Sequence, residues 1–377
     1  MFKCCAFGPR DKVQSGVRSR LAAVSDWPEV LRLAEHHGVT PLVYQALRDA
    51  ADAVPAGVLD DLRRRYEHNA RRNLMFTAEL FRIIDRLEAN GLTAIPYKGP
   101  ALAETAYGDL ALREFSDLDL LVRRRDVPRA KEAVKELGYT PAHRFTQVEE
   151  RAYLESGYEF VFDGPAGRNL LEIQWAILPR FYAVDFDLEG SFDRASVANV
   201  GGKQMRTLSP EDLLLSLCVH AAKHAWIRLC WLRDIASVVE TLPLQWDRVV
   251  NQATALGVRR IFEISLLLAN RWLGAAVPDW IVANAADDRT IGMRCEEIAK
   301  HIGNAEEYRT ESFRYFRLIA RLRERFSDRW RFGLRLAFTP SLGEWALVKL
   351  PEPLFPLYRL IRVFRLAGRV LASSGGE

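Results

Sequence analysis

The sequence predicts an α+β protein in which a small mixed sheet lies between helical segments along the chain. Apolar residues recur at helical spacing before residue 91, and helical periodicity returns from residue 209. Between them, short apolar strands alternate with helices and end in a hairpin. With 377 residues, 49% of them hydrophobic and 27% charged, the chain is long enough for a sizeable core.

Composition narrows the class of protein. The net charge of +4 is small for this length, so charge alone does not indicate nucleic-acid binding. Five cysteines fit neither a zinc site nor a disulfide framework, which favours reduced thiols and a cytoplasmic protein. No apolar run approaches the roughly 18 residues that a membrane-spanning helix needs, so we expect no transmembrane segment.

The N-terminal part is predicted to be helical after a poorly ordered start. Residues 1–24 show no clear period, and residues 25–91 form a helical segment. Its helices are expected over Trp27–His37, from Thr40 to about Ala51, and from about Val58 to Asn90. The last of these has apolar positions at helical spacing at Leu74, Leu80, Phe81, Ile84 and Leu87.

Residues 92–208 are predicted to form the α/β domain. The cluster from Gly164 to Gly167 is typical of a hairpin turn between two strands. Strands are expected over Thr93–Tyr97, Leu118–Val122, Tyr158–Phe162, Leu170–Ile177 and Lys203–Leu208. Helices are expected over Ala101–Tyr107 and Asp126–Leu137.

The remainder is predicted to be helical in two parts. Ser209 and Pro210 open a helical domain over residues 209–335, and Asp212 has the spacing of a capping box. Residues 336–377 form a tail that prolines break into short pieces, with a basic amphipathic helix over Tyr358–Leu371.

Two carboxylates and a Lys-Gly turn are the main chemical signal. Asp117 and Asp119 lie two apart in a predicted strand, so they share one face of the sheet. Neighbouring carboxylates repel each other unless a cation lies between them, and hard oxygen ligands suit Mg²⁺. Lys98-Gly99 precedes a predicted helix, whose N-terminus can bind phosphate. Two solvated acids at a strand end remain the alternative interpretation.

With these residues in place, the chain resembles the bacterial uncharacterised nucleotidyltransferase family. This family belongs to the polymerase-beta-type superfamily and often occurs in peptide natural-product gene clusters. The resemblance runs from Trp27 onward and depends on the order and spacing of several motifs. They are Lys98-Gly99, Tyr107, Arg113, Ser116–Val122, Leu137–Tyr139, Glu172–Trp175, His220-x-x-Lys223-His224, Trp231-Leu232-x-Asp234 and the proline-rich LPEPLFPLYRLIR.

The resemblance implies a nucleotidyltransferase domain with three carboxylates at its centre. Asp117 and Asp119 match the two metal-binding acids of the superfamily, and Glu172 matches the third. The third acid either completes the Mg²⁺ or Mn²⁺ site or activates the attacking hydroxyl, and its strand should lie beside the first. A strand-edge acid, or a buried ion pair with an arginine, is the alternative for Glu172.

The resemblance also implies a set of nucleotide-binding residues. They are Lys98, Gly99, Arg113, Ser116, Gln174, His220, Lys223 and His224. Two positions depart from the pattern: Pro100 stands where the superfamily has Ser and gives no N–H, and Gln174 stands where relatives often have His. Gln174 still has the means to bind a ligand or to orient Glu172, because they share a face.

The helix after Ser209 presents a second polar cluster. His220, Lys223 and His224 share one face, and Lys223 is expected at the triphosphate. Zinc binding by the two histidines is disfavoured, because no third ligand is apparent and Lys223 would repel the metal. Trp226 and Trp231 are candidates to flank a base, with core packing as the alternative.

Together these observations predict an Mg²⁺-dependent nucleotidyltransferase that uses a nucleoside triphosphate. The acceptor is a hydroxyl-type group, with a natural-product peptide as one candidate, and phosphoryl transfer is a variation on the same site. A catalytically lapsed nucleotide- or peptide-binding module and a toxin-like transferase acting on tRNA are the alternatives. The basic segment 309–335 and the last helix are expected to pack on the protein itself, with nucleic acid, a partner or a membrane surface less favoured.

Overall fold

A mixed five-stranded sheet forms the centre of the α/β part. The computed structural model describes residues 2–8, 10–167, 169–303 and 312–374. The strand order is β1-β2-β5-β4-β3, with β2 and β5 parallel and the other neighbours antiparallel. The strands are β1 Ala94–Pro96, β2 Asp117–Val122, β3 Thr140–Pro141, β4 Glu159–Asp163 and β5 Leu170–Gln174. The predicted mixed sheet and the β4–β5 hairpin are therefore confirmed.

A second, two-stranded sheet lies outside the main one. The predicted strand near residue 203 is β7 (Lys203–Thr207), which pairs antiparallel with β6 (Ser196–Val200). The β6 strand (SVANV) was not predicted from the sequence, and its Val197 is exposed. This hairpin is therefore a local addition and not a sixth strand of the central sheet.

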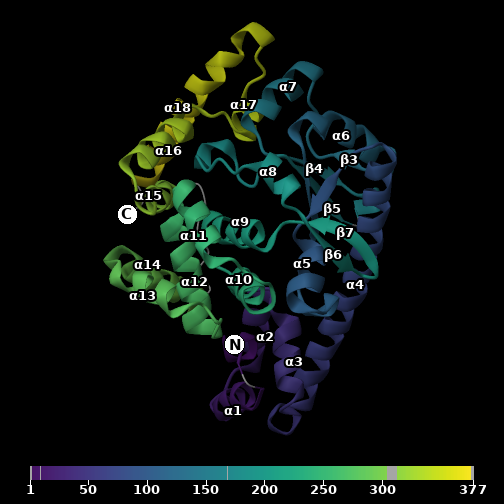
Figure 1. The fold of residues 1–377 in the computed structure, drawn as a ribbon, viewed down its shortest axis with the longest axis vertical. Helices are drawn as coiled ribbons and strands as arrows, with labels where there is room; N and C mark the ends of the chain where they lie inside the picture. Colours follow the sequence, from purple (N-terminus) through teal and green to yellow (C-terminus); the bar gives the residue numbers. More distant parts are fainter. Residues whose placement is uncertain (1, 9, 168, 304–311, 375–377) are drawn as a thin grey trace.

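Helices α2–α4 agree with the sequence prediction. Their bounds are α2 Trp27–His36, α3 Thr40–Arg48 and α4 Ala56–Ala89. Asp26 caps α2, since its side chain accepts a hydrogen bond from Glu29 N–H. The long α4 runs beside the sheet (Figure 1) and buries Leu80, Ile84 and Leu87. Leu74 lies in this helix as expected, but it is 60% exposed.

The first residues are more ordered than the sequence indicated. Phe2–Cys5 forms the short helix η1, and Arg10–Leu21 forms α1, where we had expected a poorly ordered segment over residues 1–24. Cys5 is fully buried, and its carbonyl oxygen accepts a hydrogen bond from Arg233 Nη1 at 2.6 Å. The segment gains order from these contacts with distant helices, which local periodicity does not reveal.

Short helical elements lie between the strands of the central sheet and between β5 and the β6–β7 hairpin. They are α5 Gly99–Leu102, the π-helical turn η3 Ala103–Tyr107, the 3₁₀ turns η4 Leu110–Leu112 and η5 Arg124–Asp126, α6 Val127–Lys135, α7 Gln147–Ser156, the 3₁₀ turns η6 Pro165–Gly167 and η7 Arg180–Tyr182, and α8 Leu188–Asp193. Helix α7 begins at a capping box formed by Thr146 and Glu149. It had not been predicted from the sequence.

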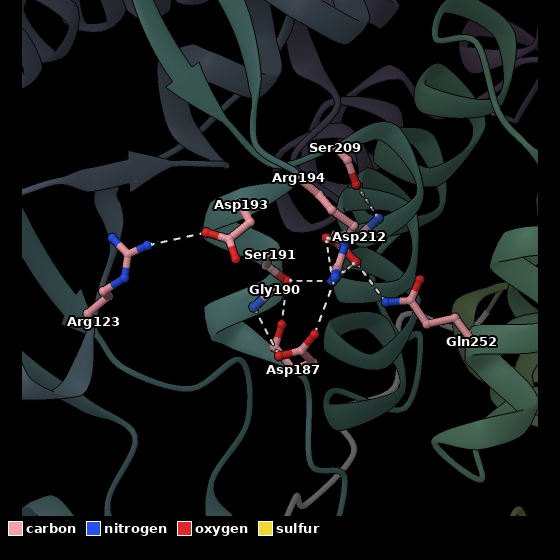
Figure 2. Close-up of polar contacts among 9 residues, drawn as sticks. All are labelled: Arg123, Asp187, Gly190, Ser191, Asp193, Arg194, Ser209, Asp212 and Gln252. Carbon is pink, nitrogen blue, oxygen red and sulfur yellow. Dashed lines mark hydrogen bonds and ion pairs between the residues drawn. The ribbon is translucent and has the colours of Figure 1, made fainter.

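A polar cluster joins the sheet part to the helical domain (Figure 2). Ser209 caps α9 (Pro210–Lys223) as predicted, because its Oγ accepts a hydrogen bond from Asp212 N–H. Within the described residues, the other bond of the predicted capping box, from Ser209 N–H to the Asp212 side chain, is not formed. The Asp212 carboxylate instead accepts hydrogen bonds from Arg194 and Gln252. These contacts fix the start of α9 between α8 and α11.

Buried helices follow α9 and make up the helical domain. Their bounds are α10 Leu229–Thr241, α11 Trp246–Ala255, α12 Arg259–Leu273, α13 Asp279–Asp287 and α14 Arg289–Gly303. Trp226, considered as a base-flanking residue, lies in this core instead. It is fully buried, and its Nε1 donates to Ser265 Oγ at 2.9 Å.

The C-terminal helices stand on the opposite side of the molecule from α4 (Figure 1). They are α15 Phe313–Arg321, α16 Phe326–Phe338, α17 Leu342–Leu347, the 3₁₀ helix η8 Glu352–Leu357 and α18 Tyr358–Ser374. Arg314, Arg317, Arg321 and Arg325 are exposed, in agreement with a solvated face, whereas residues 309–311 of the basic segment lie outside the described residues. Phe326, expected to pack on the bundle, is 80% exposed.

The last helix packs onto its own chain, as the favoured interpretation predicted. Tyr358 and Arg362 of α18 are each 1% exposed, and Arg362 Nε donates to the Leu336 carbonyl oxygen.

No helix within the described ranges combines the length and apolar character that crossing a membrane requires. All five cysteines are free thiols, as expected.

Candidate active site

The parallel strands β2 and β5 bring two of the predicted carboxylates side by side. In the register of this pair, Asp119 lies opposite Glu172 and Asp117 lies opposite Leu170. Residues opposite each other on neighbouring strands point to the same face of the sheet. The prediction that the strand of Glu172 lies beside that of the two aspartates is therefore confirmed.

The predicted site residues gather around one polar cavity of about 550 Å³. We call it the carboxylate cavity. The predicted residues that line it are Lys98, Arg113, Ser116, Asp117, Asp119, Glu172, Gln174, His220, Lys223 and His224. Gly99 does not line this cavity, and it packs against the backbone of Asp117. Its φ is +51°, and an added Cβ would lie 3.4 Å from the Asp117 carbonyl oxygen.

Lys98 is an internal counter-ion of the carboxylates. Its Nζ lies 3.0 Å from Asp119 Oδ1, and the side chains of the pair are 11% and 2% exposed. Burial lowers the pKa of Lys98, but Asp119 and the other nearby acids raise it more, so the pKa lies well above its ordinary value. The helix that follows the Lys-Gly turn is short, because α5 passes into the π-helical turn after four residues.

Gln174 links the carboxylates through its side-chain amide. Its Nε2 donates to Asp119 Oδ1 at 3.0 Å and to Glu172 Oε2 at 2.7 Å. The Tyr97 hydroxyl donates to Gln174 Oε1 at 2.7 Å, which fixes the orientation of the amide. Gln174 is 2% exposed, so these contacts favour the orienting role over direct contact with a nucleotide.

Glu159 is a fourth carboxylate that the sequence analysis missed. It lies opposite Gln174 in the β4–β5 pair and lines the same cavity. The hairpin turn was recognised in the sequence, and counting the register outward from it would have placed Glu159 there. Burial, and then the charges of Asp119 and Glu159, raise the pKa of Glu172 to about 9. Without a bound cation, the crowded carboxylates therefore favour the protonated form of Glu172 at pH 7.

The chemistry of the carboxylates fits a divalent cation, but their oxygen atoms do not converge on one point. Hard oxygen donors on adjacent strands are the ligand set that Mg²⁺ takes, and burial and then the Asp119 charge raise the pKa of Asp117 and of Glu172. Within the described ranges, no three His, Cys, Asp or Glu side chains already converge as metal ligands. Lys98 and Gln174 both approach Asp119 Oδ1, and the Lys98 ammonium supplies positive charge there.

Helix α9 supplies the facing wall of the cavity. Lys223 Nζ donates to the Tyr158 hydroxyl at 3.0 Å and lies 5.0 Å from the centre of that ring. Burial lowers the pKa of Lys223 and of His220, and burial followed by the Lys223 charge lowers that of His224 to about 3. The two histidines are therefore neutral rings at pH 7.

Trp231 packs against both of these histidines. Its ring stacks on His224 with centroids 4.7 Å apart, and it meets His220 edge-on at 5.9 Å. Trp231 also lines the carboxylate cavity, so it remains a candidate to contact a base. Asp234 does not contribute to this cluster, because its carboxylate bonds to Tyr107 and Arg113.

Arg113 is held by an ion pair where a phosphate contact had been expected. Its Nε and Nη2 donate to the two oxygens of Asp234 at 2.8 and 3.0 Å, and the Tyr107 hydroxyl donates to the same carboxylate at 2.6 Å. This cluster ties the loop before β2 to helix α10. Nη1 is buried and has no hydrogen-bond partner among the described residues.

Comparison with solved structures gives weak similarities. The antibiotic-resistance factor ANT(2'')-Ia has 16% identity and a TM-score of 0.32, over 61% of this chain and 99% of that one. The lincosamide antibiotic adenylyltransferase LnuA, with lincomycin bound, has 17% identity and a TM-score of 0.31, over 43% and 94%. A nucleotidyltransferase-like protein from Paracoccidioides brasiliensis has 15% identity and a TM-score of 0.31, over 49% and 86%. At these TM-scores the similarities say nothing about what this chain binds.

The family comparison is decisive. No curated protein matches the sequence. A family model described as "Uncharacterised nucleotidyltransferase" matches residues 23–274, which is more than half of the chain. The matched region contains the central sheet, the carboxylates and helix α9. The chain belongs to this nucleotidyltransferase family and is a nucleotidyl-transfer enzyme.

Proposed function

We propose that the enzyme transfers a nucleoside monophosphate from a nucleoside triphosphate to a hydroxyl group of an acceptor, with Mg²⁺ or Mn²⁺ as the metal. One observation carries the proposal. Asp117 and Asp119 of β2 and Glu172 of β5 line the same cavity as Lys98 and Lys223. This arrangement combines a site for a divalent cation with cations for a triphosphate.

The residues divide the work as follows. Asp117, Asp119 and Glu172 hold the cation, whose charge offsets that of the phosphates and keeps the carboxylates ionised. Lys223 binds a phosphate oxygen. Lys98 also binds a phosphate oxygen when Asp119, its partner in the ion pair, binds the cation. Gln174 keeps Asp119 and Glu172 in their relative orientation through its two hydrogen bonds. The cavity thus provides positioning and electrostatic stabilisation, which supply most of the catalysis in phosphoryl transfer.

The transfer itself needs a base and a leaving group. The acceptor oxygen forms a bond to the α-phosphorus, while the bond from the α-phosphorus to the oxygen that bridges to the β-phosphorus breaks. Pyrophosphate leaves with that oxygen, and the acceptor proton passes to the Glu172 carboxylate. Attack at the γ-phosphorus would give phosphoryl transfer instead. A natural-product peptide is one acceptor in keeping with the sequence resemblance.

Calorimetric titration tests the proposal. ATP, GTP, CTP and UTP are titrated separately into the protein, with and without Mg²⁺, and the incubated nucleotides are then analysed by mass spectrometry. We expect Mg²⁺-dependent binding of at least one triphosphate, and release of pyrophosphate when a hydroxyl-bearing acceptor is added. Release of a nucleoside diphosphate with transfer of phosphate to that acceptor would indicate phosphoryl transfer. Binding that is indifferent to Mg²⁺, or failure to bind any of the four triphosphates, would contradict the proposal.

A further inference from the structure

A second cavity, of about 330 Å³, lies next to the carboxylate cavity. We call it the aromatic cavity, after the rings of Tyr153, Tyr158, Phe181 and Tyr182 that line it. Leu342 and the neighbouring residues of α17 form another part of its wall. Helices α7 and α17, which contribute to this wall, lie near each other in Figure 1.

The two cavities share a boundary. Tyr158, Glu159, Lys223 and His224 line both of them. Lys223 and Tyr158 are hydrogen-bonded across this boundary at 3.0 Å. A ligand in the aromatic cavity would therefore have the catalytic carboxylates directly beyond the Lys223–Tyr158 contact.

The strand order shows how the two cavities are arranged along the sheet. Lys98 follows β1 at one end of the order β1-β2-β5-β4, and the metal-binding carboxylates are on β2 and β5. Glu159 begins β4 and Tyr158 directly precedes it, beyond Glu172 in the strand order, and both line the aromatic cavity. Lys98 and the aromatic cavity are thus on opposite sides of Glu172, whereas Lys223 lies at the boundary of the two cavities. Because Glu172 is the proposed base, the acceptor must approach it from the side that the triphosphate leaves open.

The chemistry of the wall selects the occupant. Among the residues that line only this cavity, the charged one is Arg365, and its Nη1 is paired with Glu344 Oε1 at 2.7 Å. Gly157 lets the Tyr153 ring lie across the end of α7, because an added Cβ would be 2.5 Å from Tyr153 Cζ. Away from the boundary residues Glu159 and Lys223, the wall consists of rings and its ionic group is already paired, which favours a flat apolar group over a phosphate or a sugar.

Hydrogen bonds also connect the wall of the aromatic cavity to the backbone of Lys223. The hydroxyls of Tyr182 and Tyr315 are hydrogen-bonded at 2.5 Å, and the Tyr315 hydroxyl donates to the Lys223 carbonyl oxygen at 2.7 Å. Tyr315, Leu342 and Arg365 lie beyond residues 23–274, where the family model matches. The C-terminal helices therefore add a feature to the site that the matched region does not contain.

We propose that the aromatic cavity binds the acceptor, and that the acceptor is a molecule whose reactive hydroxyl is attached to an aromatic or similarly flat apolar group. This inference rests on the proposed function. The apolar group lies between Tyr153, Phe181 and Leu342, and the hydroxyl reaches past Lys223 and Tyr158 to Glu172. Acceptor choice then depends on the C-terminal helices, while the triphosphate is bound within the region that the family model matches.

The test uses 2-(2-naphthyl)ethanol as a probe with a flat apolar group and a hydroxyl. Fluorescence titration measures its binding to the full chain, with and without Mg²⁺ and the preferred triphosphate. Ser156→Trp fills the cavity from the end of α7, and Leu342→Trp fills it from α17. Arg151→Trp adds the same ring to an exposed position of α7 and is the matched control. Thermal melting confirms that each variant is folded.

We expect the wild type and Arg151→Trp to bind the probe equally, and each cavity-filling variant to bind it at least tenfold more weakly. Triphosphate affinity should be unchanged in all of them. Absence of probe binding in the wild type, equal binding in a folded cavity-filling variant, or competition between probe and triphosphate would overturn the inference. Competition would mean that the cavity holds the base. Loss of the proposed function is seen separately, as failure of the wild type to bind any triphosphate with Mg²⁺.

Discussion

The carboxylate cavity and the aromatic cavity share four residues, yet they are built on different physical principles. The first is lined by buried ionised groups that neutralise one another, as Lys98 and Asp119 do at 3.0 Å. The second is lined by rings, and Arg365, the charged residue that it does not share with the first, is paired with the buried Glu344. In the first, removal of one charge leaves another uncompensated, whereas in the second, shape and volume decide what fits.

The difference teaches where specificity for each substrate resides. A triphosphate and a divalent cation are recognised by charge, so their site needs a few residues at fixed positions on β2, β5 and α9. An apolar group is recognised by a surface, which the chain assembles from α7, η7 and α17. The two cavities should therefore respond to different substitutions, and Lys223 at their boundary should respond to both.

The largest effect is expected from Asp119→Asn. Loss of this charge removes a proposed metal ligand and the partner of Lys98, so transfer should fall by roughly 10³-fold or more. Probe binding in the aromatic cavity should be unchanged. Product formation is followed by mass spectrometry, with Asp163→Asn at the exposed end of β4 as the matched control. Full activity in Asp119→Asn would mean that the metal assignment is wrong.

The next effect concerns the ion pair that supports the carboxylate cavity. Arg113→Met leaves Asp234, which is 2% exposed, without its cation, and should lower the free energy of unfolding by roughly 3–5 kcal/mol. Arg32→Met breaks the similar but exposed pair with Glu29 and should have a much smaller effect, because solvent screens that pair. Urea denaturation measures both. Equal losses would show that burial does not distinguish the two pairs.

Lys223→Met tests the boundary between the cavities. Loss of a charge-assisted contact should weaken triphosphate binding by roughly 10- to 100-fold, since such bonds contribute about 1.5–3 kcal/mol. Probe binding should also change, because Lys223 lines both cavities. Calorimetry and fluorescence titration give the two affinities, and Lys203→Met on β7 is the control. An effect on only one ligand would show that the cavities are independent.

The smallest effect is a change in the pH dependence of stability. The pKa of His224 is about 3 in the folded protein, against an ordinary value of about 6.5. Between these values the unfolded chain binds a proton that the folded protein does not, so stability falls as the pH drops below 6.5. At pH 5, which is 1.5 pH units below the ordinary pKa, His224 should lower the free energy of unfolding by about 2 kcal/mol, at about 1.36 kcal/mol for each pH unit.

His224→Phe should remove this contribution while keeping a ring against Trp231. Urea denaturation at pH 7.5 and pH 5 should show that the variant loses less stability than the wild type. His143→Phe, at an exposed position, should behave like the wild type. A pH dependence in His224→Phe identical to that of the wild type would refute the assignment of a neutral, buried ring.

Local features of the sequence predicted much of the fold and part of the site. The cap at Ser209, the long helix α4 and the hairpin turn before β5 depend on neighbouring residues, so periodicity and turn chemistry identified them. The same holds for the carboxylates of β2, because alternation in a strand fixes which side chains share a face. Glu159 was missed because the register of the hairpin was not counted out.

Other features could not be predicted, because they depend on contacts between distant segments. Arg113 meets Asp234 across a separation of 121 residues, and no local pattern pairs them. Trp226 and Trp231 look alike in the sequence, yet packing buries the first in the core and places the second on the cavity wall. Order in α1 likewise depends on contacts of the N-terminal segment with helices far along the chain.

By itself the sequence determined the secondary structure around the site and the residue types that carry its charge, because both follow from local spacing. Only the tertiary structure decided which cation neutralises which carboxylate, and that an aromatic cavity lies beside them. The physical reason is that buried charges and apolar surfaces take their partners from whatever packs against them. For this cavity those partners come from α7, η7, α9, α17 and α18, which only the folded chain brings together.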